Sequence, residues 1–166
     1  MSEPNECYAY FGISGSFDPA EITNRVGIIP TRTAGEGESI PGSNARKKYS
    51  RWSLHSRLER TATLEMHVLD VLEQLDGNEP AFKQLSEEFG GVMELVGHFS
   101  AFYPGLFLDC QTVSRLAQYA LSVDCDFYVP ELPGKDSDHS RPDAGEHIEM
   151  NSSLAIRLLS ARNSKP

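Results

Sequence analysis

The strict alternation of apolar and polar residues at positions 123–129 constrains the fold more than any other feature of the sequence. This period of two predicts a β-strand that has one buried face and one solvated face. Such strands are typical of a mostly antiparallel sheet that helices cover on a single side. The two faces carry different residues: Val123, Cys125, Phe127 and Val129 on the face expected to be buried, and Asp124, Asp126 and Tyr128 on the other.

Turn and capping signals predict the elements of the first half of the chain. An aromatic-rich segment at 7–13 predicts a strand, and Asp18-Pro19-Ala20-Glu21 predicts a helix start, because Asp accepts hydrogen bonds from free amides and Pro suits the first helical position. Gly27 predicts the end of this helix. Residues 30–50 predict a long loop, and residues 51–54 a strand in which Trp52, the only tryptophan, is the expected core anchor.

The second half of the chain adds three helices and a hairpin to this prediction. Amphipathic spacing predicts helices over 64–75, 80–89 and 113–121. Residues 92–100 predict a strand with 106–108 as its hairpin partner. The resulting order favours an α+β fold, a ferredoxin-like and mostly antiparallel sheet with helices packed on one face.

The composition changes at residue 130, which predicts the domain organisation. We expect residues 1–130 to form a single α+β domain with a long loop at 30–50, and residues 131–166 to form a mostly disordered tail with a short apolar segment at 154–159. Residues 1–6 are acidic and polar, unlike the start of a secretory signal, and no apolar run approaches the ~20 residues that span a bilayer, so we expect a cytoplasmic protein without membrane contact.

The three cysteines are too few and too scattered for a disulfide framework. Cys7 and Cys125 lie in strand patterns and are expected to be small buried residues. Cys110 lies near a predicted helix start and is the best placed of the three for a reactive thiol.

The charge is unevenly distributed along the chain. The net charge is −9, which argues against a general nucleic-acid binder. Between positions 25 and 60, however, eight basic residues outnumber three acidic ones, so this window is +5 and the rest of the chain is −14. We therefore expect the molecule to have a basic side and a strongly acidic side.

Four segments together resemble a bacterial family of small proteins known as domain of unknown function 4279. The resemblance covers residues 7 to about 130 and implies a compact bacterial domain, but no reaction. Small acidic bacterial proteins of this build include toxin immunity proteins, which is an analogy of build alone. The segments are Tyr10-Phe11-Gly12-Ile13-Ser14-Gly15 with Phe17-Asp18-Pro19-Ala20-Glu21-Ile22-Thr23, then Val26-Gly27-Ile28-Ile29-Pro30-Thr31-Arg32, Trp52-Ser53-Leu54 and Leu121-Ser122-Val123-Asp124-Cys125-Asp126-Phe127-Tyr128.

A basic, aromatic-containing cluster is the first candidate site. Its cations would bind an anion or a phosphate, and Arg32 would add a forked contact at the mouth of the long loop. The structural alternatives are a solvated loop leading into a buried tryptophan, and an Arg32 that ties the loop to Asp18 or Glu21. The candidate ligand-binding residues are Arg32, Arg46, Lys47, Lys48, Arg51 and Trp52.

The acidic face of the strand at 123–129 is the second candidate site, with Asp124, Asp126 and Tyr128 as partner-binding residues. Two aspartates at this spacing can also hold a divalent ion, although solvated acids on an outer face are common. The five histidines are dispersed and form no zinc motif. We therefore expect no metal or other cofactor, and no catalytic residue can be assigned.

These features favour a non-enzymatic macromolecule-binding protein whose partner is another protein, an immunity-like role in which the acidic surface captures a basic partner. The alternative is a sensor of a small anionic ligand or nucleotide phosphate that uses the basic loop between residues 32 and 51. An enzyme of a kind that the sequence does not reveal is a third hypothesis. We do not expect nucleic acid as a partner.

Overall fold

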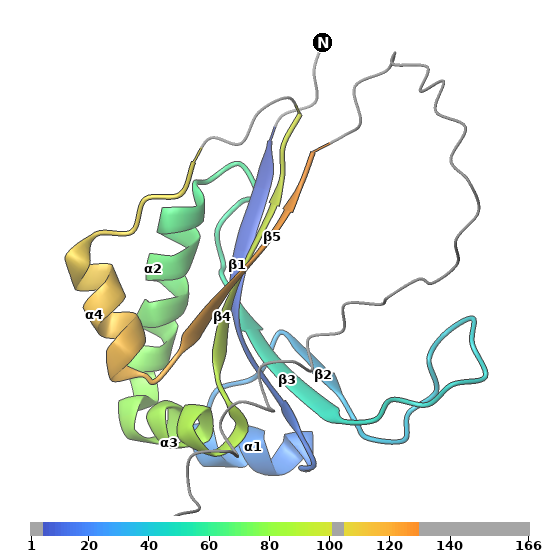
Figure 1. Ribbon diagram of the computed structural model, residues 1–166. Helices are drawn as coiled ribbons and strands as arrows, with labels where there is room; N and C mark the ends of the chain where they lie inside the picture. Colours follow the sequence, from blue (N-terminus) through green and yellow to red (C-terminus); the bar gives the residue numbers. More distant parts are fainter. Residues whose placement is uncertain (1–4, 101–104, 130–166) are drawn as a thin grey trace, which may run out of the picture. The chain divides into compact units, whose positions relative to one another are not determined.

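A computed structural model describes residues 5–100 and 105–129, which form one open sheet with helices on a single face (Figure 1). The strands lie in the order β2-β3-β1-β4-β5. They are β1 (Glu6–Gly15), β2 (Arg32–Ala34), β3 (Ser50–His55), β4 (Val92–His98) and β5 (Ser122–Tyr128). The helices are α1 (Pro19–Val26), α2 (Leu64–Leu75), the 3₁₀ turn η1 (Asp76–Asn78), α3 (Glu79–Phe89) and α4 (Cys110–Gln118).

The sheet is antiparallel except for its last pair, β4 and β5, which are parallel and joined through α4. This confirms the predicted α+β class, the mostly antiparallel sheet and the one-sided helical layer. The ferredoxin-like arrangement is not confirmed. In a split βαβ unit another strand lies between the two parallel strands, whereas β4 and β5 are direct neighbours here.

Aromatic side chains fill the core between the sheet and the helices. Phe11 of β1 contacts Trp52 of β3 and Phe82 of α3, both edge-on, with ring centroids 6.1 and 5.4 Å away. Trp52 is completely buried, and its indole N–H donates to Oγ1 of Thr23 over 3.1 Å. The predicted core anchor is therefore confirmed, and its polar atom is satisfied.

Aspartate side chains cap the starts of α1 and α4, and the cap of α1 is the one that the sequence predicts. Asp18 accepts from the amide of Ala20 over 2.8 Å, and Gly27 ends α1 with a φ of 72°, in the left-handed region that glycine favours. Asp109 caps α4 in the same way, accepting from the amide of Thr112 over 2.7 Å, so this helix begins at Cys110 and ends at Gln118, three residues before each end of the predicted 113–121. The predicted helices at 64–75 and 80–89 are confirmed as α2 and α3.

Three sequence predictions were wrong in detail. Residues 106–108 form no strand, and Leu106 and Phe107 are exposed instead of pairing with β4. The segment 30–50 is not wholly loop, since it contains β2 and an isolated antiparallel bridge between Ser39 and Arg46. We call residues 35–49 the arm, because this segment projects away from the sheet (Figure 1).

The third correction concerns β5. Val123 and Cys125 are exposed although they lie on the helix side of the sheet, and only Phe127 and Val129 of that side pack against the core. Cys7 is buried as expected, but Cys125 is not, because β5 is an edge strand that the helices cover incompletely. The predicted tail, with its apolar segment at 154–159, lies outside the described residues. None of the described helices is long and apolar enough to cross a membrane.

Candidate functional site

The side of the sheet that faces away from the helices, here called the open face, brings residues from four strands into one row. Register pairs His55 of β3 with Tyr10 of β1, Tyr10 with Glu94 of β4, and Glu94 with Asp124 of β5. Directly paired residues point to the same side of a sheet, so these four side chains share the open face. The row therefore runs from an imidazole through a phenol to two carboxylates.

An aromatic stack occupies the middle of the open face. The His55 ring lies 4.6 Å from that of Tyr10 and 6.0 Å from that of Tyr8, and all three rings are nearly parallel. The guanidinium carbon of Arg60 lies 4.6 Å from the Tyr8 ring centroid, a cation–π contact. Burial, and then the charges of Arg32 and Arg60, lower the pKa of His55 to about 4. His55 is thus neutral at physiological pH and extends the stack as an uncharged ring.

Carboxylates gather on the β4–β5 side of this stack. Burial raises the pKa of Glu94, and the negative charges of Asp124 and Asp126 raise it further, against a smaller opposing effect of Arg51. Within residues 5–100 and 105–129, no cation forms an ion pair with any of these three acids. The cluster therefore carries mutual repulsion that an incoming cation would relieve.

The candidate basic residues divide into two groups. Arg32 and Arg51 lie on the open face, because they pair with Ser53 and Ser14, which point to that side. Arg32 makes no ion pair with Asp18 or Glu21 in the described part of the chain, so the structure does not show the predicted tie.

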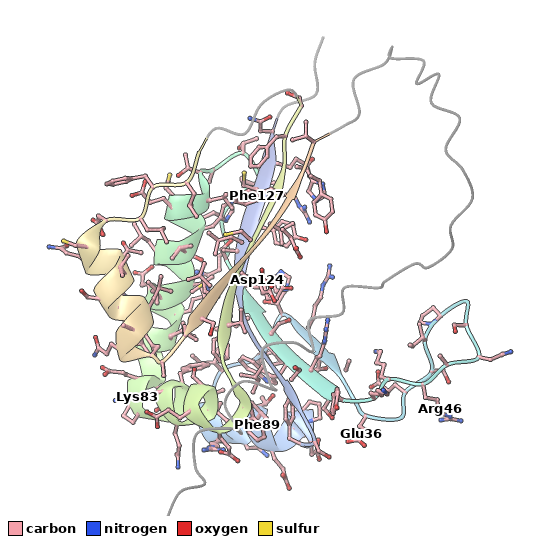
Figure 2. All side chains as sticks on the ribbon, viewed as in Figure 1. Glu36, Arg46, Lys83, Phe89, Asp124 and Phe127 are labelled. Atoms are coloured by element: carbon pink, nitrogen blue, oxygen red, sulfur yellow. The ribbon has the colours of Figure 1, made fainter. Side chains whose placement is uncertain are left out.

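The remaining candidate cations lie in the arm, away from the sheet (Figure 2). Arg46 donates to the carbonyl of Gly37 over 2.8 Å, and Lys47 pairs with Glu38 over 2.8 Å. Lys48 is exposed. Trp52 is buried on the helix side, so its ring cannot contact a ligand on the open face. The predicted cluster does not converge on one site.

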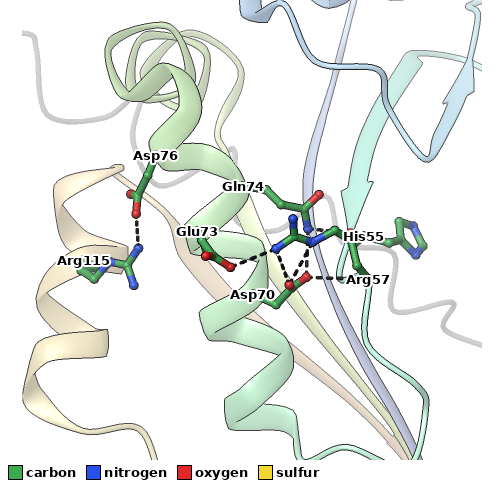
Figure 3. Close-up of polar contacts among 7 residues, drawn as sticks. All are labelled: His55, Arg57, Asp70, Glu73, Gln74, Asp76 and Arg115. Carbon is green, nitrogen blue, oxygen red and sulfur yellow. Dashed lines mark hydrogen bonds and ion pairs between the residues drawn. The ribbon is translucent and has the colours of Figure 1, made fainter.

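A hydrogen-bonded clamp holds the end of β3, and with it His55, against α2 (Figure 3). Asp70 accepts from the backbone amide of Arg57 over 2.8 Å and from the Arg57 guanidinium over 2.7 and 3.0 Å. Gln74 donates to Asp70 and to the carbonyl of His55, each over 3.0 Å. Burial raises the pKa of Asp70, but the hydrogen bonds from Arg57 and Gln74 outweigh it and hold this pKa below its usual range.

A buried serine–histidine pair lies on the helix side of the sheet. The Ser56 hydroxyl is hydrogen-bonded to Nδ1 of His67, and burial lowers the pKa of His67, which favours the neutral form of this ring. Such a pair can activate a nucleophile. The His67 side chain has no exposed surface, however, so a substrate cannot reach it. We interpret the pair as a polar contact within the core.

The family model described as domain of unknown function, DUF4279, matches residues 5–130. The chain belongs to this family. Neither the curated proteins nor the solved structures gave a match. The DUF4279 domain therefore spans every strand from β1 to β5, which confirms the resemblance that the sequence motifs carry.

Sequence reasoning missed the aromatic half of the site in this DUF4279 protein. Tyr8 and Tyr10 alternate along β1 with the apolar residues Cys7, Ala9 and Phe11. The period of two, which predicted that the acids of β5 lie on the outer face, therefore also predicts that these two tyrosines lie on the outer face. His55 and Glu94 give no comparable signal. Their place beside Tyr10 depends on strand register, which the sequence alone does not specify.

Proposed function

We propose that this DUF4279 protein is a non-enzymatic binding protein that captures a basic segment of another protein on its open face. The row formed by His55, Tyr10, Glu94 and Asp124 supports this proposal most strongly. It sets a flat aromatic surface directly beside carboxylates that have no ion pair within the described residues. A lysine or arginine side chain suits both features, because its stem packs on rings and its charge pairs with acids.

The position of two hollows away from the open face supports a macromolecular partner over a small molecule. Two hollows of about 310 and 550 Å³ are lined by other residues, the first around the start of α2 and the second between α2 and α4. Neither is lined by the aromatic stack or by the acids of β4 and β5. Ligands of small size bind in concave sites, whereas proteins bind flat surfaces with aromatic anchors.

Electrostatics supports a basic partner. The raised pKa of Glu94 follows from burial and from two neighbouring negative charges, and a partner cation would lower this pKa again. Linkage then requires that binding strengthens as the pH rises through the pKa of Glu94, because the ionised form binds the cation better. Steering by the acidic side would also speed association and weaken with added salt.

The decisive test compares capture by two charge-matched variants of the full chain. The face variant carries Glu94→Gln, Asp124→Asn and Asp126→Asn. The control carries Glu21→Gln, Glu59→Gln and Glu87→Gln, three exposed acids that make no ion pair among the described residues. We expect a lysine- and arginine-rich protein to be recovered in stoichiometric amount by the wild type and the control, and to be lost with the face variant. Equal recovery by all three would refute the proposal.

An anionic ligand is the second candidate, favoured by Arg32 and Arg51, which lie on the open face without an ion pair in the described chain. Thermal denaturation with millimolar inorganic phosphate or nucleotides tests this candidate. Stabilisation that disappears in the Arg32→Gln, Arg51→Gln double variant would favour it over the protein partner.

A further inference from the structure

We propose that the outer edge of β5 accepts an extended strand from the partner, and that this strand alternates apolar with basic residues. The inference rests on the proposed function and makes it more specific. β5 is the last strand of the sheet and has seven residues, long enough for strand addition, whereas the opposite edge strand β2 has three. Within the described residues, β4 is the one strand that pairs with β5.

The hydrogen-bond pattern shows which backbone groups of β5 face outward. The amide of Ser122 donates to the carbonyl of Gly91 over 3.1 Å, and the carbonyl of Tyr128 accepts from the amide of Phe99 over 2.8 Å. The even-numbered residues of β5 thus turn their backbone groups toward β4. Since successive residues of a strand turn these groups to opposite sides, Val123 and Cys125 present theirs at the free edge.

The side chain of Asp124 forms a hydrogen bond with one of these outward-facing backbone groups in the free protein. Its carboxylate accepts from the amide of Cys125 over 2.9 Å. A side chain that satisfies an edge amide in this way protects an exposed edge from indiscriminate pairing. An incoming strand would replace the carboxylate at this amide with a backbone carbonyl, and the released Asp124 would be available to pair with a cation of the partner.

The side chains of β5 specify the sequence of the added strand. On the helix side, Val123 is 43% exposed and Cys125 is also exposed, so apolar partner residues would cover them. On the open face, Asp124 and Asp126 would lie opposite lysine or arginine. Only a strand with alternating apolar and basic residues satisfies both sides.

The same side chains disfavour a second copy of β5 as the partner strand. Pairing two copies across the edge would set Asp124 and Asp126 against the corresponding acids of the other copy. Like charges placed opposite each other destabilise a sheet. Charge complementarity therefore favours a basic strand from a different protein over self-association.

The test uses the full chain labelled with ¹⁵N and a synthetic seven-residue peptide that alternates valine and lysine. We expect chemical-shift changes and slowed hydrogen exchange at the amides of Val123 and Cys125. A peptide that alternates valine and glutamate is the control and should not bind. In a D124K/D126K variant the preference should reverse, with the glutamate peptide binding and the lysine peptide not.

Backbone methylation separates strand addition from binding by charge alone. In an antiparallel arrangement the valine amides of the peptide face β5, and in a parallel arrangement the lysine amides do. Methylating one of these two sets should therefore raise Kd about tenfold or more, because two or three hydrogen bonds are lost. Methylating the other set should leave Kd nearly unchanged.

Each outcome of this experiment decides between the proposals. Strand addition is wrong, while capture on the open face stands, if two results occur together: both methylated peptides bind the wild type as well as the parent peptide does, and neither binds the D124K/D126K variant. If the native partner is lost with the face variant but the valine–lysine peptide fails to bind, strand addition is again wrong. If the peptide binds only after Leu154, Ile156 and Leu158 are replaced by Asp in the full chain, residues 154–159 compete for the edge and the external strand is refuted.

Discussion

Replacing Asp70 with alanine should destabilise the domain far more than replacing Glu73, although both acids lie on α2 and both pair with Arg57. The Asp70 side chain is 9% exposed and accepts four hydrogen bonds, two of them from the Arg57 amide and from Gln74. The Glu73 side chain is 73% exposed and accepts one, from the Arg57 guanidinium over 2.9 Å. Exposed ion pairs contribute little, whereas a buried carboxylate that satisfies several donors contributes much.

The expected magnitude follows from the donors that lose their acceptor. Removing the Asp70 carboxylate leaves the Arg57 amide and the Gln74 amide group without it, next to the end of β3. Hydrogen bonds to charged groups contribute about 1.5–3 kcal/mol each, and partial solvation of the vacated site offsets some of this, so we expect a loss of about 2–4 kcal/mol. That corresponds to a fall in Tm of roughly 8–15 °C. Glu73→Ala should change the stability by no more than the error of urea denaturation.

The pH dependence of this difference gives a second readout. The pKa of Asp70 is lower in the folded protein than its ordinary value, so the stabilisation is fully present above the unfolded pKa of about 3.9 and is lost as the pH falls through the folded pKa. The gap between wild type and Asp70→Ala should therefore shrink from about pH 5 downward. A gap as small as that of Glu73→Ala at pH 7, or one that stays constant down to pH 2, would contradict the reasoning.

Three further predictions concern the open face and its support. The pKa of Glu94 is raised by folding, so the wild type should lose stability relative to Glu94→Gln as the pH rises from 4 to 7. Urea denaturation at each pH measures this difference, and a difference that stays constant over this range would contradict the prediction. The imidazole of His55 should titrate near pH 4 in NMR, and Arg32→Gln should raise this pKa because it removes one of the positive charges that lower it. A titration midpoint near pH 6.5 for His55 in the wild type would be inconsistent with the burial of the ring. Gly91→Ala should destabilise the domain by about 1–3 kcal/mol in thermal denaturation, because the added Cβ would lie 2.6 Å from Cβ of Ser86 and 2.9 Å from Cδ2 of Leu121. Gly12→Ala is the control and should have little effect, because its Cβ would contact the Tyr10 ring at an ordinary distance of 3.4 Å.

Local signals in the sequence predicted local structure well. Asp18 and Gly27 specify the two ends of α1 through contacts within a few residues, so the pattern and the structure agree there. The alternation at 123–129 correctly predicted a strand with acids on the outer face. It did not predict that Val123 and Cys125 would be exposed, because the position of a strand within a sheet is a property of the whole chain.

The same distinction explains what could be predicted of the candidate site. Asp124 and Asp126 were assigned to the outer face from the pattern of β5 alone. The grouping of the cations was not predictable, because residues 46–48 are near Arg51 in sequence but the arm carries them away from the sheet (Figure 2). Conversely, His55 and Glu94 are 39 positions apart, and only the antiparallel pairing of β1 with both β3 and β4 sets them on either side of Tyr10.

The open face and the β5 edge meet at Asp124, and this residue links the two proposals physically. One carboxylate there raises the pKa of Glu94 across the β4–β5 pair and also accepts from the edge amide of Cys125. A partner cation that draws the Asp124 carboxylate toward the open face would release the Cys125 amide, and a partner strand that takes this amide would release the carboxylate for the cation. Because each contact lowers the free-energy cost of the other, charge and backbone recognition should be cooperative. Asp124→Asn should therefore weaken binding of the unmethylated valine–lysine peptide more than binding of the peptide whose β5-facing amides are methylated. Equal losses of binding free energy for the two peptides in a double-mutant cycle would show that the two contacts are independent.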